Sequence, residues 1–268
     1  MGKKKRNRQG VCKLTSQSGA FVDSHIVPEA LSRPSVSGNP LFQYAEGQRP
    51  IRRWTSWYDR QLVTAEGEQY LSEIDAWGIA KLRETRLVWS GWGADTRLKG
   101  HTQPVGSSIG VRAVEVKDSG KLRLFFHSLL WRAAASGLNE FKDIRVNNSD
   151  LDCLRREVVG LESPPLDFYP VQLTQLSTKG PMHNQTPVPD IKYLPRLGSP
   201  ESPPHEVPMF RFYLDGLIAH IYRTLPDGYD LSEFGEIIVG SGPSVALATV
   251  TFEDSFQFLN MKKFLGPN

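Results

Sequence analysis

Apolar residues recur every three or four positions in two long parts of the chain, a spacing typical of helices with one buried face. The first part carries Tyr70, Leu71, Ile74, Trp77 and Leu82. The second begins at Lys121 and carries a wider apolar stripe: Leu122, Phe125, Phe126, Leu129, Leu130 and Ala133. We expect this second helix to be the main hydrophobic anchor. A third helix is expected from Ser149, as its N-cap, to Gly160, which ends it.

Alternation of apolar and polar residues predicts strands near both ends of the chain. Two short apolar runs, at 11–14 and 20–22, flank a turn at 17–19 and predict a hairpin. Near the C-terminus, MFRFYLDGLIAHIYR alternates on both sides of Asp215-Gly216, a dipeptide typical of hairpin turns. Another strand is expected near 246–252. The segment LVWSGWG is expected to be extended, because Gly91 and Gly93 interrupt any helix.

Residues 163–208 hold more than half of the nineteen prolines. Proline excludes a long helix and disfavours central strands, so this part is expected to form loops and extended segments, with an edge strand at 169–176. The pattern therefore predicts an α+β protein. It divides into a basic flexible tail at 1–10, a small module at 11–90, a helical region at 91–162 and a β-rich C-terminal region at 163–268.

The composition is that of a folded protein, with 39% hydrophobic and 23% charged residues among 268. No run of apolar residues is long enough to span a membrane. The basic N-terminus is not followed by an apolar segment, which argues against a secretory signal. Two cysteines, Cys12 and Cys153, do not make a disulfide framework, so the cytoplasm is the expected compartment.

Basic residues are clustered, although the net charge is only +3. One cluster lies at the N-terminus: Lys3, Lys4, Lys5, Arg6 and Arg8. A second cluster interleaves arginine with tryptophan: Arg49, Arg52, Arg53, Trp54 and Trp57. Such side chains neutralise phosphates and stack on bases, so both clusters are candidates for nucleic-acid binding. The alternatives are a solvated tail and tryptophans that belong to the core.

The most informative candidate for chemistry is His25. It stands at the end of a short strand, is followed by Ile26 and Val27, and Pro28 halts the strand. An imidazole held in this way can remove a proton from water while a divalent metal ion stabilises the charge on a phosphate.

Three segments of the chain, CKLT, SHIVPEAL and LVTAEGEQYLSEID, resemble parts of HNH-type nuclease proteins. LRLFFHSLLWRAAASGLNEFKDIRV resembles a segment that accompanies this N-terminus in many bacterial proteins. The resemblance covers residues 11–160 and implies a ββα module at 11–90. In this resemblance His25 corresponds to the general base. Asp59 falls at the position of the middle asparagine of the HNH motif, and Glu68 at the position of a metal ligand. The resemblance therefore implies that Asp59 and Glu68 bind Mg²⁺ or Mn²⁺.

The chain departs from this family pattern at its cysteines. Two CxxC pairs would bind a structural zinc ion, but only Cys12 remains, and Thr15, Thr64 and Gly67 stand at the other positions. No structural zinc is therefore expected, and packing should replace it through four side chains: Leu14, Phe21, Leu62 and Val63. Ser24 also stands where active members commonly carry an aspartate.

Three hypotheses for the function follow. The first is an HNH-type, metal-dependent endonuclease acting on DNA or RNA, for which the resemblance implies a setting such as bacterial defence. The alternative is a catalytically inactive module that binds nucleic acid or docks an unknown protein partner. In that case His25 is a strand-end residue, and Glu68 is a carboxylate favoured by the helix dipole. A regulator that acts through the proline-rich segment is a third hypothesis.

Overall fold

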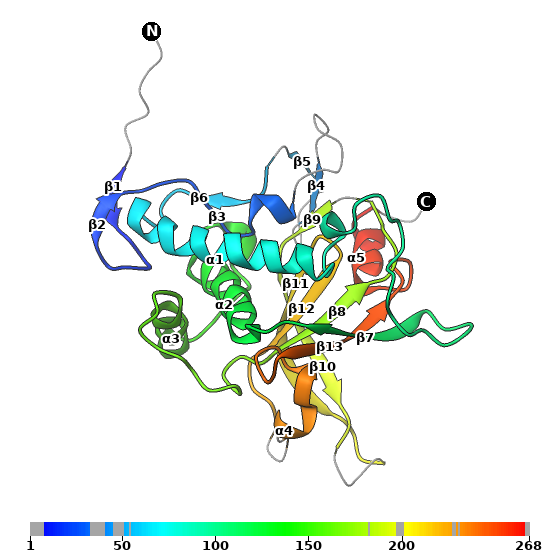
Figure 1. Cartoon of the computed structure of the whole chain (residues 1–268). Helices are drawn as coiled ribbons and strands as arrows, with labels where there is room; N and C mark the ends of the chain where they lie inside the picture. Colours follow the sequence, from blue (N-terminus) through cyan, green and yellow to red (C-terminus); the bar gives the residue numbers. More distant parts are fainter. Residues whose placement is uncertain are drawn as a thin grey trace.

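The chain combines several helices with a six-stranded mixed sheet, and this is the α+β class expected from its sequence (Figure 1). The computed structural model describes residues 8–32, 41–44, 51–53, 55–181, 183–196, 201–226, 229 and 231–265. Of these, 41–44, 51–53, 232–233 and 263–265 are described by their backbone alone. No helix in the described ranges is long and apolar enough to cross a membrane.

The six-stranded sheet has the order β10-β11-β12-β8-β13-β7. Its strands are β10 (Val188–Leu194), β11 (His205–Leu214), β12 (Leu217–Tyr222), β8 (Val171–Leu176), β13 (Ser244–Val250) and β7 (Ile109–Glu115). Neighbours are antiparallel except for the parallel pair β13 and β8. The predicted hairpin at Asp215-Gly216 is confirmed, because both residues adopt the positive φ that a tight turn between β11 and β12 requires.

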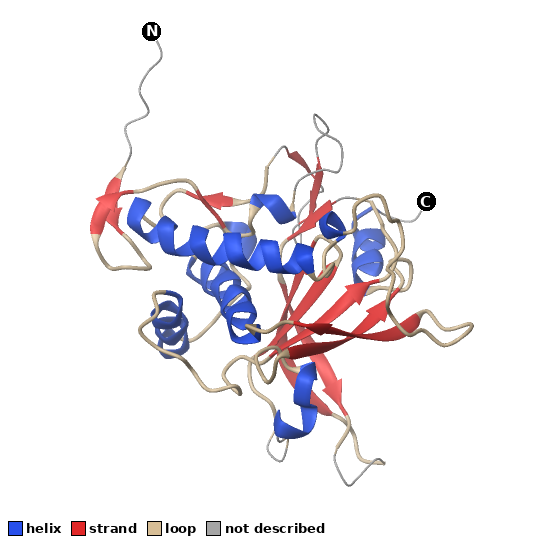
Figure 2. Cartoon of the chain, viewed as in Figure 1, coloured by secondary structure: helices blue, strands red, loops and turns tan. Residues whose placement is uncertain are grey.

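Three helices share one hydrophobic core with one face of this sheet: α1 (Ala65–Glu84), α2 (Ser119–Ala135) and α3 (Asn148–Val158). Helices α1 and α3 both pack against α2 (Figure 2). The apolar stripe of α2 is fully buried between α1 and the sheet, as its sequence predicts. Gly78 lets α1 approach α2 closely, since a Cβ at this position would lie 2.4 Å from the ring of Phe125. The main core therefore lies between the helices and the inner face of the sheet.

The opposite face of the sheet is covered in part by α5 (Phe256–Leu265), a helix that the hydrophobic pattern did not indicate. A second core lies beneath it: Trp89, Trp92, Leu98, Leu176, Tyr213, Ile218, Phe252 and Met261. A short helix, α4 (Leu231–Phe234), and the 3₁₀ turn η4 (Gly235–Ile237) follow β12.

Short strands form the N-terminal module. A hairpin forms where one was predicted, but its strands are β1 (Gln9–Val11) and β2 (Ser18–Ala20), so its turn lies at 12–17 and not at 17–19. Strand β3 (Ser24–His25) pairs with β6 (Tyr58–Asp59) just before α1. Between them lie η1 (Glu29–Leu31), β4 (Leu41–Tyr44) and β5 (Ile51–Arg53). Strand β4 also pairs with β9 (His183–Gln185), so the segment that carries β4 is hydrogen-bonded to the C-terminal part of the chain.

Several local predictions are corrected by the structure. The strand expected at the sheet edge is β8, which begins at Val171 and lies inside the sheet, because β12 and β13 flank it. Within the proline-rich part, Pro189 lies on the edge strand β10, where an absent N–H is tolerated. Asn147, not Ser149, caps α3, since its side chain accepts from the Asp150 amide. The region expected to be helical, 91–162, also contains the strand β7. The segment 87–93, which was expected to be extended, contains the 3₁₀ turn η2 (Trp89–Gly91).

One buried ion pair joins three elements of the N-terminal half. Arg132 of α2, only 1% exposed, donates to both carboxylate oxygens of Asp75 on α1 at 2.9 and 2.5 Å. The same guanidinium donates to the His25 carbonyl of β3 at 3.2 Å and to the Ser128 hydroxyl at 3.1 Å. The packing of α1, α2 and β3 therefore depends on a single charged group that is fully paired.

We expect Asp75→Asn to lower the free energy of unfolding by about 3–5 kcal/mol, because the Arg132 charge would stay buried without its counter-charge. Urea unfolding at neutral pH measures the change. The matched control is Asp152→Asn, whose ion pairs with Arg155 and Arg156 are at the surface. This control should lose less than about 1 kcal/mol. Equal losses in both variants would contradict a special role for the Arg132–Asp75 pair.

Candidate functional site

The β3–β6 ribbon decides where the predicted site residues point. Ser24 lies opposite Asp59, and His25 lies opposite Tyr58. Because neighbouring residues of a strand face opposite sides, the His25 ring and the Asp59 carboxylate lie on different faces of the ribbon. The ring contacts agree, since the His25 and Tyr58 rings meet edge to face with centroids 6.0 Å apart.

His25 is a half-buried histidine at the surface of the module. Its Nε2 atom lies 3.2 Å from the Thr55 hydroxyl. Burial lowers the pKa of His25 below its ordinary value; the Glu29 carboxylate opposes this shift and the Arg132 charge adds to it. The ring is therefore mainly neutral at pH 7, the form that can accept a proton.

Asp59 anchors the segment that follows α2. Its Oδ2 atom accepts from the Ser136 hydroxyl at 3.0 Å and from the Gly137 amide at 2.9 Å. Its Oδ1 atom accepts from the Gln61 amide at 2.8 Å. With three donors on its two oxygens and 5% exposure, this carboxylate has a structural task that sequence reasoning did not foresee.

Glu68 lies on the first turn of α1 and faces the interior of the module. Burial raises its pKa above the ordinary value, and the Ser24 hydroxyl and the Arg132 charge oppose this shift. Neither the Glu68 Oε2 atom nor the Ser24 Oγ atom makes a hydrogen bond of good geometry to the described residues. Glu68 thus lies toward β3, on the side of Ser24, whereas the His25 ring faces Tyr58.

The three predicted residues, His25, Asp59 and Glu68, are near one another in the fold but their functional groups point in different directions. Within the described ranges, no group of three or more His, Cys, Asp or Glu side chains is arranged to hold a metal ion. The assignment of Mg²⁺ or Mn²⁺ to Asp59 and Glu68 stays a prediction.

The four positions at which the resemblance predicts cysteines lie together: Cys12, Thr15, Thr64 and Gly67. The Thr15 amide donates to the Cys12 Sγ atom at 3.4 Å, and a Cβ on Gly67 would lie 2.6 Å from this sulfur. Burial raises the pKa of the Cys12 thiol, but hydrogen bonds from Thr15, Thr64 and Leu14 outweigh it, so the pKa lies below its ordinary value. The surrounding apolar side chains expected to replace zinc are fully buried at three positions, Leu14, Leu62 and Val63, and partly buried at Phe21.

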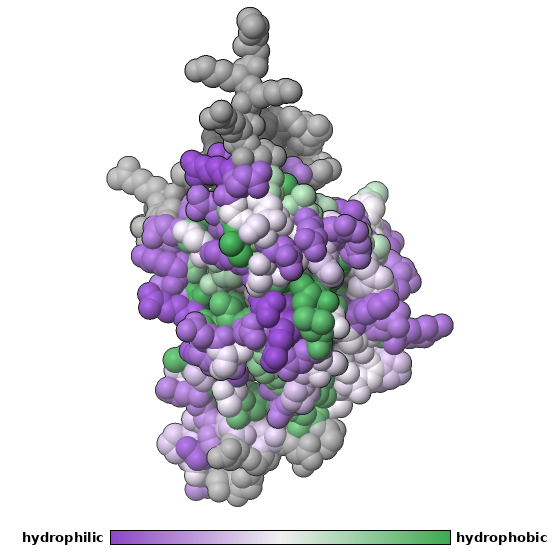
Figure 3. Space-filling view, turned by 90° about the vertical axis from the view of Figure 1, so that its left-hand side faces the viewer, coloured by the Kyte–Doolittle hydropathy of each residue, from purple (hydrophilic) through white to green (hydrophobic). Residues whose placement is uncertain are grey.

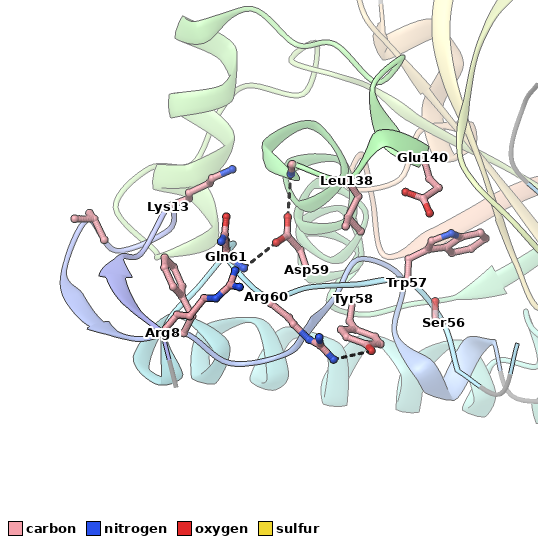
Figure 4. A pocket seen from close by; sticks show the side chains of 13 residues that line it. Arg8, Lys13, Ser56, Trp57, Tyr58, Asp59, Arg60, Gln61, Leu138 and Glu140 are labelled. Carbon is pink, nitrogen blue, oxygen red and sulfur yellow. Dashed lines mark hydrogen bonds between the residues drawn. The ribbon is translucent and has the colours of Figure 1, made fainter. Parts of the chain in front are cut away.

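A pocket of about 610 Å³ opens beside β6, between the β1–β2 hairpin and the segment after α2 (Figure 4). Arg8 and Lys13 lie at one end, and Arg60 and Tyr58 lie along the lower side between the two ends. Ser56, Trp57 and Glu140 lie at the other end, with Leu138 between. The side of the molecule that carries β1 and β2 is largely hydrophilic, with small apolar patches (Figure 3).

Two of the residues predicted to bind nucleic acid lie at this pocket. Arg8 is exposed, whereas Trp57 is 7% exposed and packs edge to face on Phe141, so most of its ring belongs to the core. Arg52 and Arg53 are described by their backbone alone. The remaining members lie outside the described residues: Lys3, Lys4, Lys5, Arg6, Arg49 and Trp54.

Sequence reasoning missed Lys13, Arg60, Ser56 and Glu140, which also line the pocket. Lys13 and Arg60 each stand alone among uncharged or acidic neighbours, so no local charge run marked them. Glu140 comes from a segment 80 residues after Arg60, and only the fold brings the two to one cavity.

No family model matches this chain, and neither a curated protein nor a solved structure matches it.

The convergence of Cys12, Thr15, Thr64 and Gly67 predicts that a zinc site can be built at these positions. We expect the variant Thr15→Cys, Thr64→Cys, Gly67→Cys to bind about one zinc ion per chain, because four thiolates would then meet in a tetrahedral arrangement. Bound zinc after gel filtration, and the spectrum of the cobalt form, measure this. Wild type and the single Thr15→Cys variant are the controls. A folded triple variant without stoichiometric metal would contradict the prediction.

Proposed function

We propose that this chain is a nucleic-acid-binding protein that holds phosphates at the pocket beside β6. The observation that carries the proposal is the convergence of Arg8, Lys13 and Arg60 on this one cavity from two distant parts of the chain. A cationic pocket flanked by aromatic rings is the usual means of binding single strands and backbones.

Two of these cations lack a counter-charge in the described part of the chain. Arg8 makes no ion pair there, and the Lys13 ammonium donates to the Ala135 carbonyl at 2.6 Å and not to a carboxylate. Arg60 is partly neutralised, since it pairs with Asp23 at 3.2 Å and donates to the Tyr58 hydroxyl at 3.0 Å. Arg8 and Lys13 are therefore free to neutralise phosphates.

The acidic residues of the pocket do not cancel this charge. Asp59 is occupied by its three donors, and Glu140 lies at the far end from Arg8 and Lys13 (Figure 4). The N-terminal cluster, with Lys3, Lys4, Lys5 and Arg6, directly precedes Arg8 in the sequence and adds positive charge to the same region of the chain. Counter-ion release from the bound strand would make the affinity depend on salt.

We expect the double variant Arg8→Gln, Lys13→Gln to bind a short oligonucleotide at least about tenfold more weakly near physiological salt. It should also reduce the slope of log K against log salt by about 2, because two phosphate contacts are lost. Glutamine keeps a donor for the Ala135 carbonyl. Fluorescence anisotropy measures both quantities.

The matched control is Arg97→Gln, Lys117→Gln, which removes the same charge from exposed positions that do not line the pocket. It should change the affinity less than about twofold. Equal weakening by both double variants, or an unchanged salt slope, would overturn the assignment to this pocket.

A second candidate function is metal-dependent cleavage of the bound strand, with His25 as the general base and Mg²⁺ or Mn²⁺ as the metal ion. The observation that favours it is the state of His25, which is neutral, half-buried and next to Tyr58, a residue that also lines the pocket. His25 does not line the pocket itself, but a neutral imidazole can accept a proton from water, and Tyr58 lies between this ring and the cavity.

On this second candidate, His25→Ala lowers the rate of plasmid nicking with Mg²⁺ or Mn²⁺ by about a hundredfold or more, the usual contribution of a general base. His101→Ala, which lies on the far side of the sheet near β7, is the matched control and should nick at the wild-type rate. Absence of nicking in wild type, or equal rates in the two variants, would leave nucleic-acid binding as the function.

A further inference from the structure

We propose that the pocket beside β6 receives one unpaired base of a single strand and that the Glu140 carboxylate selects guanine. This inference rests on the proposed function and adds the class of ligand. The cavity of about 610 Å³ is in the range of pockets that enclose small ligands, whereas phosphates alone need only a surface.

The two ends of the pocket differ in chemistry. The end with Arg8 and Lys13 presents positive charge, and the other end presents the side chains of Trp57, Leu138 and Glu140 (Figure 4). A nucleotide has the same polarity, with an anionic phosphate at one end and a flat, largely apolar base with a polar edge at the other. The base would therefore lie against Leu138 and the small part of Trp57 that reaches the pocket, and its edge would face Glu140.

Two polar side chains, Ser56 and Glu140, lie at the base end of the pocket. The Ser56 hydroxyl is buried, with 3% exposure for the residue, and its Oγ atom makes no hydrogen bond. The Glu140 carboxylate is half-buried, and its oxygens are accessible from the pocket. Since a buried polar group without a partner costs free energy, the Ser56 hydroxyl indicates a ligand that supplies a partner, and Glu140 is open to the same ligand.

A carboxylate only accepts hydrogen bonds, so it selects a base by the donors on its edge. On the Watson–Crick edge, guanine alone carries two adjacent donors, N1–H and the N2 amino group. Adenine and cytosine place an acceptor beside their amino group, and thymine flanks one donor with two carbonyls. The Ser56 hydroxyl can donate to a base carbonyl. In a duplex this edge is already paired, so only an unpaired base can be read in this way.

The test measures binding of oligothymidine strands that carry one central base of each kind. We expect the strand with guanine to bind roughly tenfold more tightly than the strand with thymine, the discrimination typical of a bidentate contact. A fully paired duplex of the guanine strand should compete poorly, because its base is not available to the pocket.

The variant Glu140→Gln distinguishes a loss of guanine recognition from a general loss of binding caused by a disturbed fold. It should reduce the preference for guanine to less than about twofold, while binding to oligothymidine stays equal or tightens because a negative charge is removed. The matched control, Glu236→Gln, changes an exposed glutamate of η4 and should keep the preference.

Equal affinity for all four strands, or effective competition by the duplex, would overturn the guanine pocket and leave nucleic-acid binding intact. Weaker binding of both strands by Glu140→Gln would also overturn base reading, because it would indicate a structural role for Glu140. Absence of binding to any strand would overturn the proposed function itself.

Discussion

The N-terminal half is organised around one buried charge. The Arg132 guanidinium joins α2 to Asp75 on α1 and to the His25 carbonyl on β3. A buried charge is tolerated only when every donor finds an acceptor, so this arrangement fixes the separation and orientation of three elements at once. The position of β3, and with it the direction of the His25 and Ser24 side chains, follows from this constraint.

Four positions around one buried sulfur lie together in the N-terminal module, where the resemblance would place a zinc site. The sulfur of Cys12 lies beside Thr15, Thr64 and Gly67, and the fully buried Leu14 and Leu62 fill the neighbourhood. A structural zinc ion contributes on the order of 10–16 kcal/mol to small domains. Here the module packs against α2 and α3, so a continuous apolar core can take over this stabilising task.

Asp59 connects the module to the pocket proposed as the binding site. Its carboxylate fixes the segment after α2 by accepting from Ser136 and Gly137, and this segment carries Leu138 and Glu140 to the cavity. The acid that the family resemblance places near the metal thus shapes the wall of the cavity. Arg8, Lys13 and Arg60 line the other wall, because the β1–β2 hairpin and β6 lie side by side.

The sequence by itself determined the α+β class, the buried stripe of α2 and the hairpin at Asp215-Gly216, because periodicity and turn chemistry are local properties. The resemblance of its segments to HNH-type proteins also singled out the four positions around Cys12. Only the tertiary structure decided that β8 is a central strand, that His25 and Asp59 face opposite sides, and that Glu140 shares a cavity with Lys13. These outcomes depend on register and on contacts between residues far apart in the chain, for which no local pattern exists.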